Sequence, residues 1–265
     1  MVVIVRCALL FLTLVIAQKV SGISSGTFDI PKPVYKFEGI LGSTSEIIEN
    51  QNSLAPSFLP YNPTVIEIGS DEGAGTITLA ATYPYGRIFA FEPHPRAFAV
   101  LQENVKACKN VSPINRAINN ATGHAKLYLY RGKNNTDRGL EHLSSLLPIF
   151  KSDSNAFDNP SIMVPCVNLD DWCQLNHIDH VDFLRIDAEG LELQILENSQ
   201  NVLKKAIVIV VKTNFRQLRE NGALYPDIKQ FLEKNDFEML AHWYCEDLQG
   251  EATFVRKAYY DSIFR

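Results

Sequence analysis

Short apolar runs alternate with amphipathic stretches along the chain from Thr64 onward. Runs of four to eight residues rich in β-branched side chains are typical of buried strands, and a period near 3.6 is typical of helices. The expected strands cover residues 64–68, 87–91, 111–117, 126–130, 162–168, 181–186, 206–211, 237–243 and 252–257. The expected helices cover residues 74–82 and 96 to about 108, begin at 170 and 191, and recur after 211. This alternation predicts an α/β fold with a doubly wound, mostly parallel sheet.

Two stretches fall outside this alternation. Residues 23–63 contain five prolines and little periodicity, so we expect an N-terminal cover segment, with a short helix at 43–50, before the main domain at 64–265. Residues 132–160 are polar, rich in Asn, Ser and Asp, and too long for an ordinary connection. A loop of this length within a compact domain is often functional, and we expect it to form a lid over the acceptor.

The first 22 residues resemble a targeting segment. The apolar run from Cys7 to Ala17 is about half the length that a membrane-spanning helix needs, and it fits the central region of a secretory signal peptide. Small residues follow, so cleavage is expected after Ala17 or after Gly22. The alternatives are an uncleaved single-pass anchor over residues 2–17 and a buried core helix. We therefore expect a secretory-pathway protein, lumenal or secreted, with membrane attachment only if this segment is retained.

Composition agrees with a secreted globular protein. Removing residues 1–22 discards one of five cysteines and leaves four, which permits two disulfides in any of three pairings; the three Asn-x-Ser/Thr triplets, at Asn110, Asn120 and Asn134, indicate a glycoprotein. It also leaves 23 basic against 30 acidic residues, a formal charge of −7. With a pI near 5.7 the chain has no basic field for a nucleic-acid backbone, so we exclude that partner.

The segment from Val65 to Thr76 carries the clearest ligand signal. A strand ends in an acid, Glu67, the chain turns through Gly69, Ser70, Asp71 and Gly73, and a helix follows. Glycines permit a left-handed backbone and let a ligand approach, and a helix N-terminus offers free N–H groups. Acids here disfavour a pyrophosphate and favour a cationic ligand bearing an amino acid. S-adenosylmethionine has both a sulfonium and an ammonium group.

Two further acidic strand ends support this interpretation. Glu92 closes the next strand, where a carboxylate can accept hydrogen bonds from both hydroxyls of a ribose. Asp187, Glu189 and Glu192 follow the strand at 181–186. Ligand sites in open α/β sheets lie at the carboxyl ends of strands, where all three turns fall. Glu189 and Glu192 also suit the positive end of a helix without any ligand, so their role stays open.

Four blocks of sequence resemble the FkbM family of S-adenosylmethionine-dependent methyltransferases. They are EIGSDEGAGT from Glu67, FAFEPHP from Phe89, NLDDW from Asn168 and RIDAEGLE from Arg185, and the likeness runs from about Thr64 to Val211. The resemblance implies a seven-stranded, Rossmann-like class I methyltransferase sheet. It also implies O-methylation of a hydroxyl on a glycan or small molecule, with S-adenosyl-L-methionine as cofactor.

The resemblance also assigns roles to individual residues. The residues Glu67, Gly69, Ser70, Asp71 and Gly73 would surround the methionine part of the cofactor. Glu92 would hold the ribose, and Ala117 and Ile118 would border the adenine. Asp187 would lie near the transferred methyl group and is our first candidate for the general base, followed by His94 and His142. The sequence offers no convincing metal triad.

Two positions depart from the family pattern. Asp71 stands where the family usually has Asn, which keeps an acceptor and adds charge. Lys212 stands where the corresponding strand often ends in an acid, so the local charge near the acceptor is inverted. This substitution indicates either a different, acidic acceptor or a fold that no longer catalyses. The alternative function is thus a secreted or membrane-anchored, non-catalytic binding module with the methyltransferase fold.

Overall fold

The structure, a computed structural model, describes residues 37–40, 55–130, 141–150, 160–245 and 249–264. The side chains of residues 37–40, 244 and 245 are outside this description. The expected signal segment at 1–22, the expected helix at 43–50 and the third glycosylation triplet at Asn134 all lie outside the described residues. Those three expectations therefore stay predictions.

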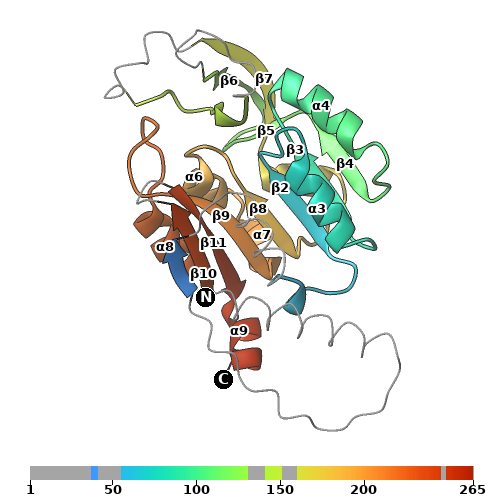
Figure 1. Cartoon of the computed structure of the whole chain (residues 1–265), viewed down its shortest axis with the longest axis vertical. Helices are drawn as coiled ribbons and strands as arrows, with labels where there is room; N and C mark the ends of the chain where they lie inside the picture. Colours follow the sequence, from blue (N-terminus) through green and yellow to red (C-terminus); the bar gives the residue numbers. More distant parts are fainter. Residues whose placement is uncertain (1–36, 41–54, 131–140, 151–159, 246–248, 265) are drawn as a thin grey trace. The chain divides into compact units, whose positions relative to one another are not determined.

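An eight-stranded sheet forms the centre of the fold (Figure 1). In spatial order its strands are β1 (Phe37–Ile40), β10 (Phe237–Cys245), β11 (Gln249–Arg256), β9 (Val208–Asn214), β8 (Phe183–Ile186), β2 (Thr64–Ile68), β3 (Arg87–Phe91) and β4 (Val111–Ile114). Only β11 runs antiparallel to its neighbours β10 and β9. The seven strands from β10 to β4 confirm the expected mostly parallel class I methyltransferase sheet. β1 comes from the expected cover segment and adds an eighth strand by pairing parallel with β10.

Helices connect these strands as the sequence pattern predicts. They are α3 (Ala74–Thr82), α4 (Pro95–Val105), α5 (Leu169–Leu175), α6 (Glu192–Glu197), α7 (Gln200–Lys205), α8 (Tyr225–Lys234) and α9 (Lys257–Phe264), with 3-10 turns η1 (Ala55–Ser57) and η2 (Glu141–Leu143). β2, β3 and α3 occupy the bounds expected for them. α4 ends three residues earlier than expected. Within the described residues, none of the helices is both long and apolar enough to cross a membrane.

The central strands are apolar on both faces because two separate cores cover them. On β9, Ile209 and Val211 belong to a core shared with α5–α8, while Val208 and Val210 belong to a second core shared with α3 and η1. All four side chains are at most 1% exposed. Burial on both faces explains the uninterrupted β-branched run that predicted this strand.

The strand expected at 111–117 is divided between two sheets. Its first part is β4 in the main sheet, and its end is β5 (Ala117–Ile118) in a small sheet of order β5-β7-β6, with β6 at Gly123–Tyr128 and β7 at Ser161–Val167. Asn115 lies at the division, where its side-chain amide donates to the backbone carbonyls of Glu92 and Pro93, at 2.8 and 3.2 Å. The small sheet therefore projects beside the carboxyl end of β3, next to the candidate site.

Candidate active site

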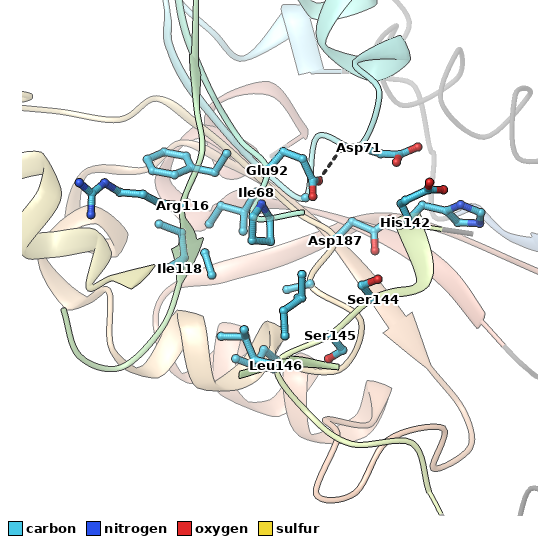
Figure 2. Close-up of a pocket in the computed structure, with 18 residues that line it drawn as sticks. Ile68, Asp71, Glu92, Arg116, Ile118, His142, Ser144, Ser145, Leu146 and Asp187 are labelled. Carbon is cyan, nitrogen blue, oxygen red and sulfur yellow. Dashed lines mark hydrogen bonds between the residues drawn. The ribbon is translucent and has the colours of Figure 1, made fainter. Parts of the chain in front are cut away.

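A pocket opens where β2, β3 and β8 end, bordered on its other sides by β5 and the segment 141–150 (Figure 2). Six of the nine residues expected at the site line it: Gly69, Asp71, Glu92, Ala117, Ile118 and Asp187. Three strands and a second sheet thus bring together residues up to 118 positions apart in the chain. The placement matches the rule for open α/β sheets used in the sequence analysis.

Gly69 lies in close contact with the backbone of Asp187, and these two residues form the floor of the pocket. Its φ is +82°, and a Cβ added there would lie 1.9 Å from the backbone oxygen of Asp187. Its N–H donates to the carbonyl of Phe91 at 2.9 Å, and the N–H of Asp187 donates to the carbonyl of Ile68 at 2.9 Å. The turns after β2, β3 and β8 are therefore joined by backbone hydrogen bonds, and only glycine fits between the first and the last.

Glu92 is fixed with its carboxylate at the pocket. Oε2 accepts a hydrogen bond from the N–H of Asp71 at 2.9 Å (Figure 2). Oε1 accepts from the N–H of His94 at 2.7 Å. Burial raises the pKa of Glu92 to about 7, against the opposing effect of these hydrogen bonds. A carboxylate has about four acceptor positions, and two are used here. The remainder can accept the two hydroxyls of a ribose.

An apolar wall lies next to Glu92. Ala117 and Ile118 of β5 are 5% and 3% exposed, and Phe91 and Leu127 complete the wall. An aromatic base packs well on such a surface because the surface has few polar groups to leave without partners. The wall therefore fits the adenine of the cofactor, as the resemblance implies.

The other three expected cofactor residues do not line the pocket. Glu67 is 2% exposed, pairs with Arg185 at 2.9 Å and accepts from the hydroxyl of Thr76. Gly73 precedes α3 with φ +92° and packs against Leu101 of α4. Ser70 is buried, and its backbone N–H donates to the carbonyl of Phe91 at 3.0 Å. The structure gives these three residues a part in shaping the turn.

Asp187 lies at the end of β8 and is paired with Lys212. The Lys212 Nζ is 3.0 Å from Asp187 Oδ1 and forms a second ion pair with Glu189. Glu189 in turn lies 4.0 Å from the Arg219 guanidinium. The inverted charge noticed in the sequence is thus compensated by two acids from the neighbouring turn. Lys212 is not free to receive an acidic acceptor.

Glu192 has a structural role in this turn. One carboxylate oxygen accepts from the N–H of Ala188 at 2.9 Å, and the other accepts from the N–H of Gly190 at 3.0 Å. The side chain is 0% exposed, and burial raises its pKa to about 7. The two acids that stayed open in the sequence analysis therefore separate: Glu192 shapes the backbone, and Glu189 holds Lys212.

The two candidate histidines lie in different settings. His94 is the N-cap of α4, where its Nδ1 accepts from the N–H groups of Arg96 and Ala97 at 3.2 and 3.5 Å. His142, on η2, lines the pocket. Capping occupies the acceptor nitrogen of His94, so the geometry favours His142 over it as a second candidate base.

The segment 141–150 supplies pocket residues that the sequence analysis did not single out. Glu141, Ser144, Ser145 and Leu146 line the pocket. Figure 2 shows Ser144, Ser145 and Leu146 across the pocket from Glu92. Glu141 pairs with Arg96, and Arg219 donates to the carbonyl of Leu143. This segment is the described part of the expected lid. Its residues lack periodicity and a motif, so the sequence carried no signal for them beyond the length of the loop.

Three of the four cysteines expected in the mature chain have described side chains. Cys108, Cys166 and Cys173 are free cysteines. Cys166 is buried in the core of the small sheet and Cys173 in a core of the main sheet, while Cys108 packs at the far end of α4. Because these three lie in different cores, no disulfide joins any two of them. Every pairing proposed from the sequence also involves Cys245, whose side chain lies outside the described residues, so the two disulfides stay a prediction. Among the described residues no cluster of three or more His, Cys, Asp or Glu side chains could hold a metal ion.

The chain is similar to several known proteins. A family model described as the methyltransferase FkbM domain matches residues 67–239. The 2-O-methyltransferase NoeI of Sinorhizobium fredii is 24% identical over 78% of this chain and 84% of its own length. The methyltransferase sdnD of Sordaria araneosa is 23% identical over 68% of this chain and 76% of its own. Aeropyrum pernix fibrillarin, solved with S-adenosyl-L-methionine, is a distant likeness: TM-score 0.45, 14% identity, 74% of this chain and 69% of that one.

Fold and site together define a methyltransferase of the class I type with S-adenosylmethionine as cofactor. The family match covers well over half of the chain, and the chain belongs to the FkbM methyltransferase family. The residues present fit the cofactor: Glu92 for the ribose, an apolar wall for the adenine, and a glycine turn with Asp71 beside it for the methionine part.

Proposed function

We propose that this enzyme methylates a hydroxyl group of a glycan or small molecule, with Asp187 as general base. The observation that supports this most is the shared pocket of Glu92 and Asp187, because it places a hydrogen-bond acceptor for the ribose and a proton acceptor in one cavity. The cofactor supplies the methyl group. The acceptor oxygen gains a bond to carbon as the carbon–sulfur bond breaks, and Asp187 receives the hydroxyl proton. The products are a methyl ether and S-adenosylhomocysteine.

The protein's main contribution is alignment, since methyl transfer is an in-line displacement. The floor formed by Gly69 and Asp187 joins the cofactor side of the pocket to the acceptor side. The relative NoeI, by its name a 2-O-methyltransferase, favours a hydroxyl as the acceptor. Ser144 on the wall formed by segment 141–150 offers a hydroxyl of its own for a polyhydroxylated acceptor.

Calorimetric titration of the folded protein with S-adenosylmethionine tests the first half of this proposal. We expect saturable binding with one site per chain. Absence of binding by protein shown to be folded would contradict the enzymatic function. It would favour the alternative, a non-catalytic module that keeps the fold.

A screen of glycans and small alcohols with methyl-labelled cofactor tests the second half. On any acceptor found, Asp187→Asn should lower kcat by about 100-fold or more, because general-base assistance contributes about 10²–10⁴-fold. His142→Ala should be compared with His94→Ala. A loss of kcat at His142 but not at His94 assigns the second base, whereas full activity of Asp187→Asn would contradict our choice of base.

We also propose that the protein acts in the secretory pathway. Two features support this: the signal-like residues 1–22 and an accessible glycosylation triplet. Asn120 is exposed in the turn between β5 and β6. Fractionation of cells that express the full chain, with protease protection of the lumenal contents, tests this location. A cytosolic, protease-sensitive protein with an intact N-terminus would contradict it.

A further inference from the structure

Lys212 lies next to the pocket, in contact with Asp187, but does not line it. It belongs to β9, next to β8 in the sheet, and its side chain is 14% exposed. The pocket wall includes Asp187 but not Lys212. Lys212 therefore acts on the pocket through the carboxylate that it holds.

The ammonium group of Lys212 is committed to the two acids of the adjacent turn. Burial alone would lower the pKa of Lys212, but the Asp187 and Glu189 carboxylates raise it above its usual value. The lysine is therefore charged, and each of its ion pairs joins β9 to the turn after β8. A buried cation is tolerated only when such partners compensate it.

The arrangement leaves Asp187 with one oxygen for chemistry. Its Oδ1 is buried and lies 3.0 Å from the Lys212 Nζ, while the side chain as a whole is 36% exposed. The exposed part is thus the side opposite the ion pair. Figure 2 shows the Asp187 carboxylate at the pocket, between the turn that carries Asp71 and the segment that carries Ser144.

The charges around this turn also cancel. Asp187 and Glu189 carry two negative charges, and Lys212 and Arg219 carry two positive charges within the same set of ion pairs. Within this set of described ion pairs, no cation is left unpaired to attract a carboxylate or phosphate.

We propose that Lys212 is a positioning residue that holds Asp187 by Oδ1, directs its second oxygen into the pocket, and sets the acceptor site for an uncharged hydroxyl. This inference rests on the proposed function, because it assigns a role within the same site. It replaces the acidic acceptor that the sequence alone left open.

The charge balance can be measured without knowing the acceptor. S-adenosylmethionine carries a sulfonium cation, and S-adenosylhomocysteine is the neutral thioether of similar shape. The ratio of their affinities, measured by calorimetry at pH 8 on the full chain, therefore reports the field near the transferred methyl group. Lys212→Met should raise the preference for the cation by about three- to tenfold, because a compensating charge is lost.

Two variants give the matched comparisons. Lys212→Arg keeps the cation and should restore the wild-type ratio. Glu189→Gln removes a negative charge and should shift the ratio in the opposite direction, toward the neutral thioether. Lys106→Met, which removes an exposed lysine paired with Glu103 on α4, controls for net charge and should leave the ratio unchanged.

The outcomes separate this inference from the proposed function. If the wild-type protein binds neither compound, the proposed function is contradicted. The inference about Lys212, which rests on it, is then contradicted as well. If wild type binds both, but Lys212→Met and Glu189→Gln leave the ratio unchanged, Lys212 does not set the field and only the inference is overturned. If Lys212→Met does not fold, Glu189→Gln alone decides between these results. A screen in which carboxylated acceptors react faster than their neutral counterparts would also overturn it.

Discussion

The backbone oxygen of Asp187 occupies the space that a side chain on Gly69 would need. A Cβ at Gly69 would lie 1.9 Å from that oxygen, and Gly69 has a φ of +82°. The glycine turn that holds the cofactor and the turn that carries the candidate base are thus in van der Waals contact. A change in one turn must displace the other.

Gly69→Ala should therefore destabilise the protein by about 3 kcal/mol or more, since both the clash and the left-handed backbone oppose it. Urea denaturation gives the change in the free energy of unfolding. Gly123→Ala is the control, because a Cβ there meets nothing within 4 Å and the residue is exposed, although its φ of +155° adds some strain. Equal losses at the two positions would contradict the close approach.

Glu92→Ala should weaken binding of S-adenosylmethionine by about 10- to 100-fold. The variant removes the acceptor for the ribose hydroxyls and leaves the N–H groups of Asp71 and His94 without their partner. Calorimetry measures the affinity, and Glu72→Ala, an exposed acid in the same turn, is the control. An unchanged affinity for S-adenosylmethionine in Glu92→Ala would contradict the assignment of Glu92 as the acceptor for the ribose hydroxyls.

Arg185→Met should lower the free energy of unfolding by about 3–5 kcal/mol, because it leaves two buried carboxylates without their cation. Arg185 lies 2.9 Å from Glu67 and 3.3 Å from Glu251. Arg87→Met, at the exposed start of β3, serves as the comparison. In the same experiments Glu67→Gln should affect stability more than cofactor affinity. A larger effect of Glu67→Gln on cofactor affinity than on stability would indicate that Glu67 binds the cofactor.

Glu192 should make stability fall as the pH rises. Burial raises its pKa to about 7 in the folded protein, above the value of 4.5 for a free side chain. Between pH 4.5 and about 7 the Glu192 carboxyl is protonated in the folded protein and ionised in the unfolded chain. The free energy of unfolding therefore falls over this range, and the stabilisation present below about pH 4.5 is lost as the pH approaches 7. Glu192→Gln should reduce the loss of stability between pH 5 and pH 8 by about 1–3 kcal/mol.

Denaturation with urea at the two pH values measures this effect. Glu92 has a pKa of similar height, so part of the pH dependence should remain in the variant. Glu197→Gln, an exposed acid on the same helix, should leave the whole dependence in place. A pH dependence equal to wild type in Glu192→Gln would show that this carboxylate is not perturbed by burial.

The glycosylation triplets at Asn110 and Asn120 should behave differently. The Asn110 side-chain amide donates to the carbonyls of Ala80 and Tyr83 at 3.3 and 2.9 Å, so a glycan, which replaces one of the two amide hydrogens, would break at least one of these contacts. Asn120 is exposed. Peptide mass spectrometry of protein secreted from eukaryotic cells should find a glycan at Asn120, removed by Asn120→Gln, and none at Asn110. The opposite pattern would contradict the fold in this region.

The sequence predicted most of the sheet because its strands are buried on both faces. β2 and β9 are short, β-branched runs, and β3 is a short run of apolar and aromatic residues. Such runs bounded by turn residues leave few alternatives. The strand at 111–117 was wrong in extent, because the contacts of Asn115 that divide it join residues more than 20 positions apart. Local patterns do not contain such contacts.

The candidate site divides along the same line. Glu92 and Asp187 were predictable because an acid at the end of a buried strand is informative by itself. Glu67 has the same pattern, yet its side chain pairs with Arg185, 118 residues away in sequence. The role of Lys212 likewise depends on which turn lies beside β9. For Glu67 and Lys212, the sequence motif shows that the residue lies at the edge of the sheet. Its contact with a residue distant in sequence decides whether the side chain has a structural or a functional role.

Strand β1 has a consequence for how the enzyme is presented. β1 runs parallel to β10, which the antiparallel β11 sets parallel to β9, so Phe37 stands at the amino edge of the sheet, opposite the edge where β2, β3 and β8 end. A linker, tag or solid support that is attached directly before Phe37 lies on the side of the domain away from the pocket. The pocket then opens at the edge of the sheet opposite that point of attachment.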